Sequence, residues 1–258
     1  MDPYAELCRL RSTLEAFAAV RLAGHPRREG VFQRLQVCLA ALEKCAKRGD
    51  YAAFHREDIA LHRTMVESCE VPTLLESWEA SVRSLDEDLL QVRKTYWPSL
   101  MALYREHVYL IRAWGAGDPV VVEQATHLHL EVGWYRKAVS EGRRPVAGSE
   151  VDRVASFLSI HHASEIDISE VAQNVAFLSP SQLTRRFHAQ FGMAPYAWLR
   201  QVRLDRARQL LRTSHDKVGE IGRQVGYRNV SHFVRDFREH FAVTPHRWRS
   251  ENRHAEPD

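Results

Sequence analysis

The chain lacks any apolar run close to the roughly 18 residues that a membrane-spanning helix needs. Its N-terminus also lacks the basic segment and apolar core of a signal peptide, because charged amphipathic sequence follows Met1-Asp2-Pro3 directly. These absences argue against a membrane protein or a secreted one. We therefore expect a cytoplasmic protein with no membrane partner.

Cysteine is scarce, and its distribution excludes two common uses. The four cysteines all lie in the first third of the chain, on segments with helical periodicity: Cys8, Cys38, Cys45 and Cys69. They show neither the paired spacing of a cysteine metal site nor the pattern of a disulfide framework. Buried, reduced thiols are the predicted state.

Strand patterns are also missing, because no stretch alternates apolar and polar residues for long enough. Apolar residues recur instead at helical spacing, so we predict an all-α protein, and a length of 258 residues suggests two domains. The N-terminal half is expected to be an antiparallel bundle of six helices. Their approximate ranges are 4–22, 31–47, 51–68, 74–95, 98–114 and 119–139.

A linker and a charge asymmetry divide the chain. Residues 141–149 contain Gly142, Pro145, Gly148 and Ser149 without apolar periodicity, which predicts domains at 1–144 and 145–258. The formal net charge is only +3, but residues 179–253 hold 15 Lys or Arg against 6 Asp or Glu. A basic C-terminal domain behind a near-neutral one is typical of a DNA-binding domain attached to a second function.

The last third carries the strongest local pattern. A short predicted helix at 218–225 ends at Gly226, which can adopt the positive φ of a tight turn, and Gly222 allows close helix crossing. A second helix follows Asn229, a good N-cap, with Phe233, Phe237 and Phe241 on its inner face. Helix, glycine turn and a second helix with a basic outer face predict a helix-turn-helix.

A weaker copy lies upstream. Its helices are expected at about 168–175 and 181–191, the second beginning at Ser179-Pro180, and a long helix at 195–212 joins the two units. The first unit lacks the turn glycine and has one extra residue before Ser179. The doubled unit, with its ending at Thr244-Pro245 and Arg247-Trp248-Arg249, resembles the AraC family of transcription regulators. That resemblance implies a seven-helix domain that binds a double-stranded DNA operator.

By the same resemblance, six positions would face the bases. They are Ser181, Thr184 and Arg185 in the first unit and Ser231, His232 and Arg235 in the second. Arginine can pair with guanine, and serine, threonine and histidine can reach base edges or phosphates. The alternative is that these residues belong to ordinary solvated helix faces.

A group of candidate metal ligands lies in the N-terminal half. Asp58 and His62 stand four residues apart on one predicted helix, so both project from the same face. His107 and His129 lie on two later helices. Imidazole and carboxylate donors suit Zn, Ni, Mn or Fe better than Ca. His55 and His127 are close competitors, and any of these histidines could instead be a surface residue or a satisfied core residue.

Residues 4–140 resemble the FCD ligand-binding domain of FadR-branch GntR regulators. The resemblance rests on Asp58 to His62, on Glu106-His107, on Gly117-Asp118 and on His129-Leu130. It implies a divalent metal held by Asp58, His62, His107 and His129, a small carboxylate effector beside it, and a homodimer. Arg11 is a candidate partner for the effector carboxylate. Its alternative is a surface ion pair with Glu15.

These patterns predict a sequence-specific DNA-binding transcription regulator whose N-terminal domain binds a divalent metal and a small organic acid. In one alternative, the metal is structural, or absent, and the regulator senses a partner or the metal itself. In another, the metal activates water for catalysis. We expect no enzyme activity, because no general base is evident beside the cluster.

Overall fold

The computed structural model describes residues 2–97, 99–142 and 149–252. The chain divides into two compact units, Met1–Gly148 and Ser149–Asp258, and each is described by itself. The predicted domain boundary at 144/145 lies outside the described residues. The described residues form helices and no strand, so the all-α prediction is confirmed. None of these helices is long and apolar enough to cross a membrane.

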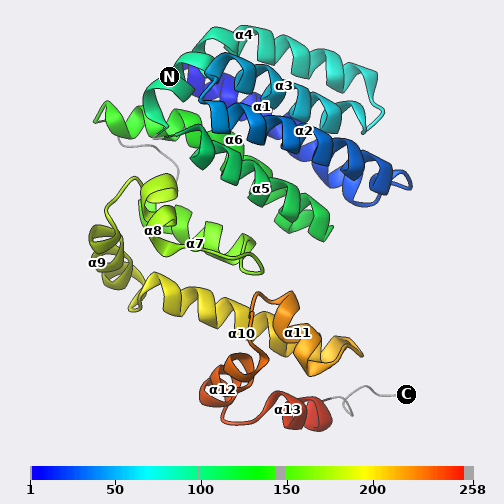
Figure 1. Cartoon of the computed structure of the whole chain (residues 1–258), viewed down its shortest axis with the longest axis vertical. Coiled ribbons are helices and arrows are strands. Elements are labelled where there is room, and N and C mark those ends of the chain that lie inside the picture. The colour runs from blue at the N-terminus through cyan, green and yellow to red at the C-terminus, as the bar shows by residue number, and fades with distance from the viewer. Residues whose placement is uncertain (1, 98, 143–148, 253–258) are drawn as a thin grey trace. The chain divides into compact units, whose positions relative to one another are not determined.

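The N-terminal unit holds the six predicted helices, coloured blue to green in Figure 1. Their bounds are α1 Pro3–Ala23, α2 Arg28–Arg48, α3 Tyr51–Glu67, α4 Pro72–Tyr96, α5 Leu100–Ala116 and α6 Pro119–Ser140. Short connections between α2 and α3, and between α5 and α6, make these neighbours antiparallel. Asp50, Ser99 and Asp118 cap α3, α5 and α6 by accepting hydrogen bonds from backbone N–H groups.

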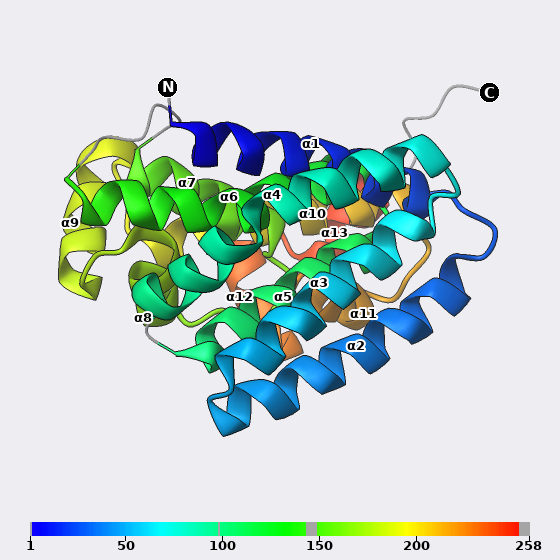
Figure 2. The same ribbon diagram turned by 90° about the horizontal axis from the view of Figure 1, so that it is seen from above.

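Helix α1 packs mainly against α6 and α4 and also touches α3, whereas α2 packs on α3 and α5. Figure 2 shows α1 along one edge of this unit, beside α4 and α6. The interior is apolar at Leu35, Leu42, Phe54 and Leu61. It also contains buried charged residues from α1, α3 and α4, and these define the site below.

The described residues of the C-terminal unit form seven α-helices, as the family resemblance predicts. They are α7 Glu150–Ile160, α8 Ile168–Val171, α9 Pro180–Phe191, α10 Pro195–Thr213, α11 Val218–Gln224, α12 Val230–Phe241 and α13 Pro245–Asn252. Helix α7 was not assigned by the sequence pattern. Its N-terminus carries a capping box between Ser149 and Asp152.

The first helix-turn-helix differs from the plain helix that its sequence predicts. Helix α8 continues into a π-helix, Ala172–Ala176, and Phe177 then takes the left-handed conformation at φ 57°. A π-helix holds one more residue per hydrogen-bonded turn than an α-helix, so it absorbs the extra residue of this unit. Phe177 occupies the left-handed position that Gly226 fills in the second unit, at φ 94°.

The second unit forms as predicted around its glycines. A Cβ placed on Gly222 would lie 2.8 Å from Cδ1 of Phe233, so a side chain there would require the buried Phe233 ring to shift. The core beneath α12 is aromatic and aliphatic, and its fully buried members include Leu204, Leu211 and Ile221. Phe233 and Phe237 complete it at 0% exposure, so the inner face of α12 is anchored against α10 and α11.

Candidate metal centre and DNA-facing helices

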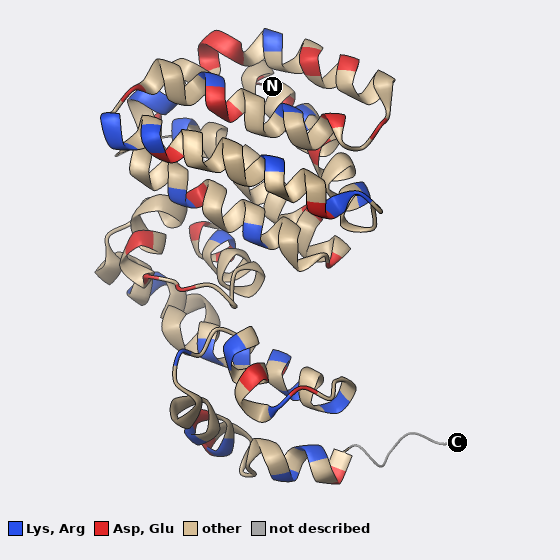
Figure 3. Ribbon diagram, turned by 45° about the vertical axis from the view of Figure 1, so that its right-hand side comes forward, with Lys and Arg blue, Asp and Glu red and all other residues tan. Residues whose placement is uncertain are grey.

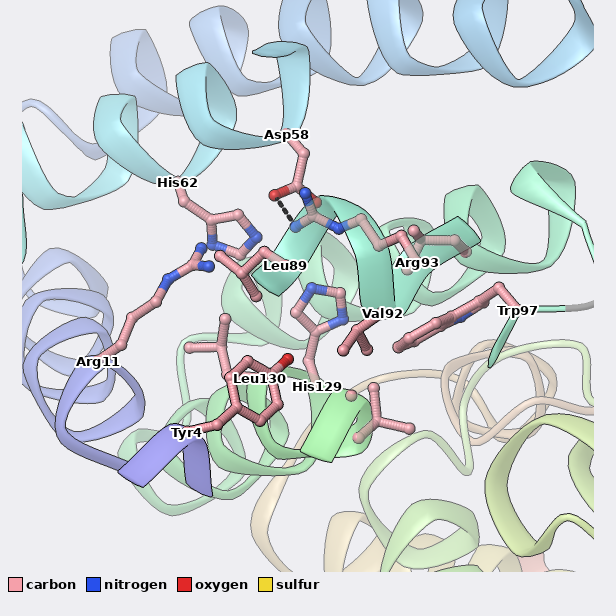
Figure 4. Close-up of a pocket in the computed structure, with 13 residues that line it drawn as sticks. Tyr4, Arg11, Asp58, His62, Leu89, Val92, Arg93, Trp97, His129 and Leu130 are labelled. Carbon is pink, nitrogen blue, oxygen red and sulfur yellow. Dashed lines mark hydrogen bonds and ion pairs between the residues drawn. The ribbon is translucent and has the colours of Figure 1, made fainter. Parts of the chain in front are cut away.

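Three helices bring three histidines together in the N-terminal unit. His62 projects from α3, His107 from α5 and His129 from α6, and one ligand nitrogen of each lies within 4.8 Å of the others. The His62 and His129 rings are stacked at 5.4 Å, and the centroids of His107 and His129 are 4.5 Å apart. Figure 4 shows the imidazoles of His62 and His129 in the pocket, with Asp58 above them. His62 and His107 are almost fully buried.

The hydrogen bonds of His107 point to a cation beside it. Its Nδ1 lies 2.8 Å from the carbonyl oxygen of Leu103, so Nδ1 must carry a proton and donate. In the neutral ring, Nε2 is then an acceptor, yet it lies 2.8 Å from Oδ1 of Asp58. Two acceptors repel at that distance unless a proton or a metal ion lies between them. This pair therefore fits a shared cation.

One ring nitrogen of His62 also contacts a buried carboxylate. Its Nδ1 lies 2.6 Å from Oε2 of Glu15, which leaves Nε2 buried without a hydrogen-bond partner in the described structure. Nδ1 of His129 is also buried and without a partner. Burial, with His107 and His62 nearby, holds the pKa of His129 well below its usual range, so its ring is neutral and free to ligate.

Glu15 is the buried carboxylate that contacts Nδ1 of His62. Its carboxylate accepts hydrogen bonds from Nε of Arg11 at 2.7 Å and from Nε1 of Trp78 at 2.7 Å, and it also contacts His62. Burial raises the pKa of Glu15, but Arg11 and His62 outweigh that effect and lower it to about 2. The Arg11–Glu15 pair expected on the surface is therefore buried, with Arg11 2% exposed.

Asp58 belongs to a second buried network. Its Oδ2 forms an ion pair with Arg93 of α4, which also contacts Nδ1 of His55. Nε2 of His55 in turn lies 2.7 Å from the exposed carboxylate of Asp86. Burial raises the pKa of Asp58, yet Arg93 and His107 outweigh that effect and hold it well below the usual range. Asp58 thus lies between Arg93 and the histidine cluster.

A cavity of about 40 Å³ adjoins the cluster. It is lined by Arg11, Asp58, His62, Arg93 and His129, together with apolar side chains such as Leu103 and Leu130. The space exceeds the volume of one water molecule. Nη2 of Arg11 is buried without a hydrogen-bond partner in the described structure, and Figure 4 shows this guanidinium beside His62. Guanidinium groups and imidazole nitrogens therefore meet in one small space.

The structure brings together the three predicted histidines and places Asp58 against His107. The competing histidines lie apart from the three-histidine group: His55 bonds to Asp86, and Nδ1 of His127 lies 2.5 Å from Oγ of Ser12. Sequence reasoning missed Glu15 as the partner of His62 and missed Arg93 altogether. The four-residue spacing of Arg11 and Glu15 was a usable signal for the first, whereas no local pattern identifies Arg93.

All six predicted base-facing residues are exposed, on α9 and α12. In α9, the Thr184 hydroxyl donates to the carbonyl oxygen of Pro180 at 2.9 Å. In α12, Oδ1 of Asn229 accepts from the backbone of Ser231 at 2.8 Å and caps the helix. Arg235 pairs with Asp236 at 3.1 Å. The Arg235 side chain is 56% exposed, whereas that of Asp236 is 10% exposed, so the guanidinium keeps a solvent-facing side that a second anion can contact.

An open hollow lies at the N-terminal end of α12. Its lining includes four arginines against the two acidic residues Glu165 and Asp236, which gives it a net positive charge; the arginines are Arg203, Arg223, Arg228 and Arg235. Lys and Arg, blue in Figure 3, recur along α10 and α13. A cationic hollow next to a capped helix N-terminus suits contacts with phosphates.

Two family models match this chain. Residues 6–132 match the FCD domain, and residues 173–251 match a helix-turn-helix domain. The first match lies within the N-terminal unit and the second within the C-terminal unit.

Two curated relatives match part of this chain. The arabinose operon regulatory protein of Escherichia coli (strain K12) is 35% identical over 79 residues, which are 30% of this chain and 27% of that protein. The protein of the same name from Salmonella typhimurium is 36% identical over 77 residues, 30% of this chain and 27% of that protein. The chain thus spans about a quarter of the length of these relatives.

Solved structures similar to this chain include DNA-binding domains. The DNA-binding domain of AdpA, in complex with a target DNA, is 27% identical and covers 43% of this chain and 99% of that one, at a TM-score of 0.41. An AraC-type transcriptional regulator from Chromobacterium violaceum is 25% identical, covers 46% of this chain and 99% of that one, and has a TM-score of 0.39.

Proposed function

Because the chain joins an FCD domain to an AraC-type helix-turn-helix domain, we propose that it is a transcription regulator that responds to a small ligand. The single observation that carries this proposal is the presence of both domains in one chain. The N-terminal unit would bind the ligand, and the C-terminal unit would bind double-stranded DNA.

In the DNA-binding unit, α9 and α12 would be the recognition helices. Arg185 and Arg235 are the side chains suited to guanine, while Ser181, Thr184, Ser231 and His232 would contact base edges or phosphates. The aromatic core under α12 holds its outer face in one orientation, which base-edge contacts require. The second unit would dominate recognition, since the cationic hollow lies beside it.

In the N-terminal unit, His62, His107, His129 and Asp58 would hold a divalent metal, Zn, Ni, Mn or Fe by donor type. When bound, such a metal would supply a positive centre for a carboxylate oxygen of the effector. The close approach of His107 Nε2 to Asp58 Oδ1, at 2.8 Å, supports this assignment, because a bound metal ion, like a shared proton, would satisfy both atoms. Glu15 would keep Nε2 of His62 directed at the metal.

Arg11 would bind the effector carboxylate through Nη2, which has no hydrogen-bond partner among the described residues. The small cavity favours a short acid over a bulky one. Binding would change the relative populations of regulator conformations and so the affinity for the operator. A coupling free energy of about 1–3 kcal/mol would give a useful response.

Metal content and thermal stability test the N-terminal half of this proposal. We expect about one metal per chain in the purified wild-type protein, and a rise in melting temperature with a subset of short carboxylic acids. His107→Ala should lose both. His127→Ala is the matched control, because this histidine lies on α6 outside the cluster, and it should keep both. A wild-type protein without metal would refute the metal assignment.

Footprinting tests the C-terminal half. The full-length protein should protect a segment of the DNA upstream of its own gene, and the acid found by thermal shift should change that protection. Arg235→Ala should weaken specific binding by about 1–3 kcal/mol. Absence of protection with and without the acid would contradict the regulator proposal.

A structural metal is the second candidate. The depth of the histidine cluster favours it, since His62 and His107 have almost no solvent exposure. In that case, chelation would unfold the N-terminal unit rather than only abolish the acid response. Circular dichroism of the chelated protein separates the two: retained helicity supports the effector site, and lost helicity supports the structural metal.

A further inference from the structure

A buried carboxylate lies directly beside a base-facing arginine on α12. Asp236 is 8% exposed, and its neighbour Arg235 is one of the residues expected to face DNA. A carboxylate removed from water costs free energy unless it is paired and hydrogen-bonded. Phe233 and Phe237 of the same helix fill the adjacent core. Asp236 therefore lies at the edge of an apolar core, and its partners indicate why a charge is kept there.

Asp236 holds Arg235 by one edge of the guanidinium. Its Oδ1 accepts from Nε of Arg235 at 3.3 Å and from Nη2 at 3.1 Å. The guanidinium is a rigid planar fork of N–H donors, so fixing the edge made by Nε and Nη2 also fixes the direction of the other edge. That other edge, made by Nη1 and Nη2, is not engaged by Asp236. Two parallel N–H donors of this kind pair with O6 and N7 of guanine.

Asp236 is itself fixed from the turn that precedes α12. The hydroxyl of Tyr227 donates to Oδ2 of Asp236 at 3.3 Å. Burial, with Asp236 beside it, raises the pKa of Tyr227, so the hydroxyl keeps its proton and remains a donor. The centroid of the Tyr227 ring lies 5.3 Å from that of Phe233 and 5.9 Å from Cζ of Arg203. The carboxylate is thus held at one oxygen by the turn, while the other oxygen holds Arg235.

Arg203 connects this group to the rest of the C-terminal unit. It is 9% exposed on α10, and its Nε donates to the carbonyl oxygen of His162 at 2.8 Å. Its Nη2 donates to the carbonyl oxygen of Ser164 at 2.9 Å. Both carbonyls belong to the connection between α7 and α8. Tyr227 therefore packs against a side chain that is anchored at two points.

The first helix-turn-helix lacks this arrangement. When the two units are aligned on their buried core residues, α9 carries Arg186 where α12 carries Asp236. Arg186 is exposed and forms an ion pair with Glu150. Arg185, the counterpart of Arg235, is therefore followed by a second cation and not by a buried acid. The buried carboxylate is thus a feature of the second unit, and the helix-turn-helix fold does not require it.

We propose that Asp236 is a positioning residue for base recognition: it fixes Arg235 so that the Nη1 and Nη2 edge meets one guanine of the operator. Tyr227 holds Asp236 in place. Only guanine presents two adjacent acceptors in the major groove, so an arginine held in this way selects guanine at one position. This inference rests on the proposed DNA-binding function and adds what sets the selectivity of α12.

Selection from a pool of random DNA duplexes measures this selectivity. The full-length wild-type protein should favour guanine at one position by about tenfold or more, and Arg235→Ala should abolish that preference. Asp236→Asn keeps the shape of the side chain and removes its charge, so it should lower the preference at least about threefold at that position alone. Tyr227→Phe should lower it at the same position and by less, because it removes only the hydroxyl.

Glu239→Gln is the matched control. Glu239 also lies on α12, 3.9 Å from Nε of Arg235, but both side chains are more than half exposed, so this pair contributes little. The substitution removes the same charge and should leave the guanine preference unchanged. A double variant, Arg235→Ala with Asp236→Asn, should select the same sequences as Arg235→Ala alone, because Asp236 acts through Arg235.

Binding to a scrambled duplex separates positioning from a structural role. Asp236→Asn should bind that duplex as tightly as the wild type or more tightly, since loss of a negative charge favours phosphate contacts. Equal weakening on every duplex would mean that Asp236 only stabilises α12, and would overturn the proposal. So would a guanine preference that Asp236→Asn leaves intact.

The same selection keeps this inference distinct from the proposed function. A wild-type protein that enriches no sequence would contradict the DNA-binding proposal itself, and the role of Asp236 with it. Enrichment that Arg235→Ala leaves unchanged at every position would refute only the role assigned to Asp236 and Arg235. Circular dichroism on each variant shows that the helices are retained.

Discussion

The two units of this protein are built around different kinds of interior. The core of the C-terminal unit is a cluster of leucine and phenylalanine side chains beneath α12. The interior of the N-terminal unit contains charged residues that are at most 7% exposed: Arg11, Glu15, Asp58 and Arg93, with His62 and His107 among them. Burying charges costs free energy that pairing rarely returns in full, so such an interior is a poor way to gain stability. It is an effective way to fix donors and acceptors around a ligand.

The difference shows how the two proposed functions would place different demands on a helical fold. A recognition helix needs a rigid base and an exposed polar face, and an apolar core supplies the base. A ligand site needs oriented polar groups that water does not satisfy, and buried ion pairs supply them. The predictions below test this contrast, from the largest expected effect to the smallest.

Gly226→Ala should destabilise the C-terminal unit most, by about 4 kcal/mol. Its Cβ would lie 2.6 Å from the carbonyl oxygen of His162, and the backbone has φ +94°, which disfavours any side chain. The same Cβ would displace Arg203, which donates to His162. Hydrogen exchange can measure the loss separately in each unit. Gly192→Ala is the control: its φ is +71° but nothing lies within 4 Å, so only about 1–2 kcal/mol should be lost.

Arg93→Met should destabilise the metal-free N-terminal unit by about 3 kcal/mol, because Asp58 and His55 would lose their buried cationic partner. Arg63→Met removes an exposed pair with Glu67 and should cost at most about 1 kcal/mol. Chemical denaturation of the chelated protein gives both values. Equal losses would mean that the buried network contributes no more than a surface pair.

Lowering the pH should weaken the C-terminal unit through His161. Burial lowers the pKa of this histidine to about 3, against about 6.5 in the unfolded chain. Between these values the unfolded state binds the extra proton, so the contribution is complete above pH 6.5 and is lost as the pH falls towards 3. The loss is at most about 1.4 kcal/mol per pH unit. Denaturation at pH 7 and 5.5 should show this dependence in full for wild type and for His188→Gln, an exposed control. His161→Gln should show less of it, because burial still lowers the pKa of His162.

Deleting Gln173 should have the smallest effect, about 1 kcal/mol or less, although it removes a residue from within a helix. Gln173 is exposed and lies in the π-helix, which can return to α-helical geometry when its extra residue is lost. Deleting exposed Gln201 from α10 rotates the rest of a regular helix by about 100° and should disrupt the unit. Thermal unfolding compares the two. A large loss on deletion of Gln173 would show that the π-helix is required.

Most helices of the fold could be predicted from the sequence, because the signals that define them are local. Periodic apolar residues, the N-caps Asp50 and Asn229 and the turn at Gly226 act within a few residues of chain, so they predict where helices begin and end. Pattern reasoning did not assign α7 and did not foresee the π-helix. The sequence showed that the first unit has one extra residue, but the packing of α8 decides where in the chain that residue is accommodated.

The histidine cluster was predicted through a resemblance, not from spacing alone. By itself, the sequence determined the helices, their charged and apolar faces, and the candidate ligands His62, His107 and His129. Tertiary structure alone decided that Glu15 orients His62, that Arg93 neutralises Asp58, and that the Arg11–Glu15 pair is buried. The physical reason is that the first two contacts join different helices, whereas the Arg11–Glu15 pair lies within α1 and is buried by the helices that pack on it. The strength of all three comes from burial, which a local sequence pattern does not record.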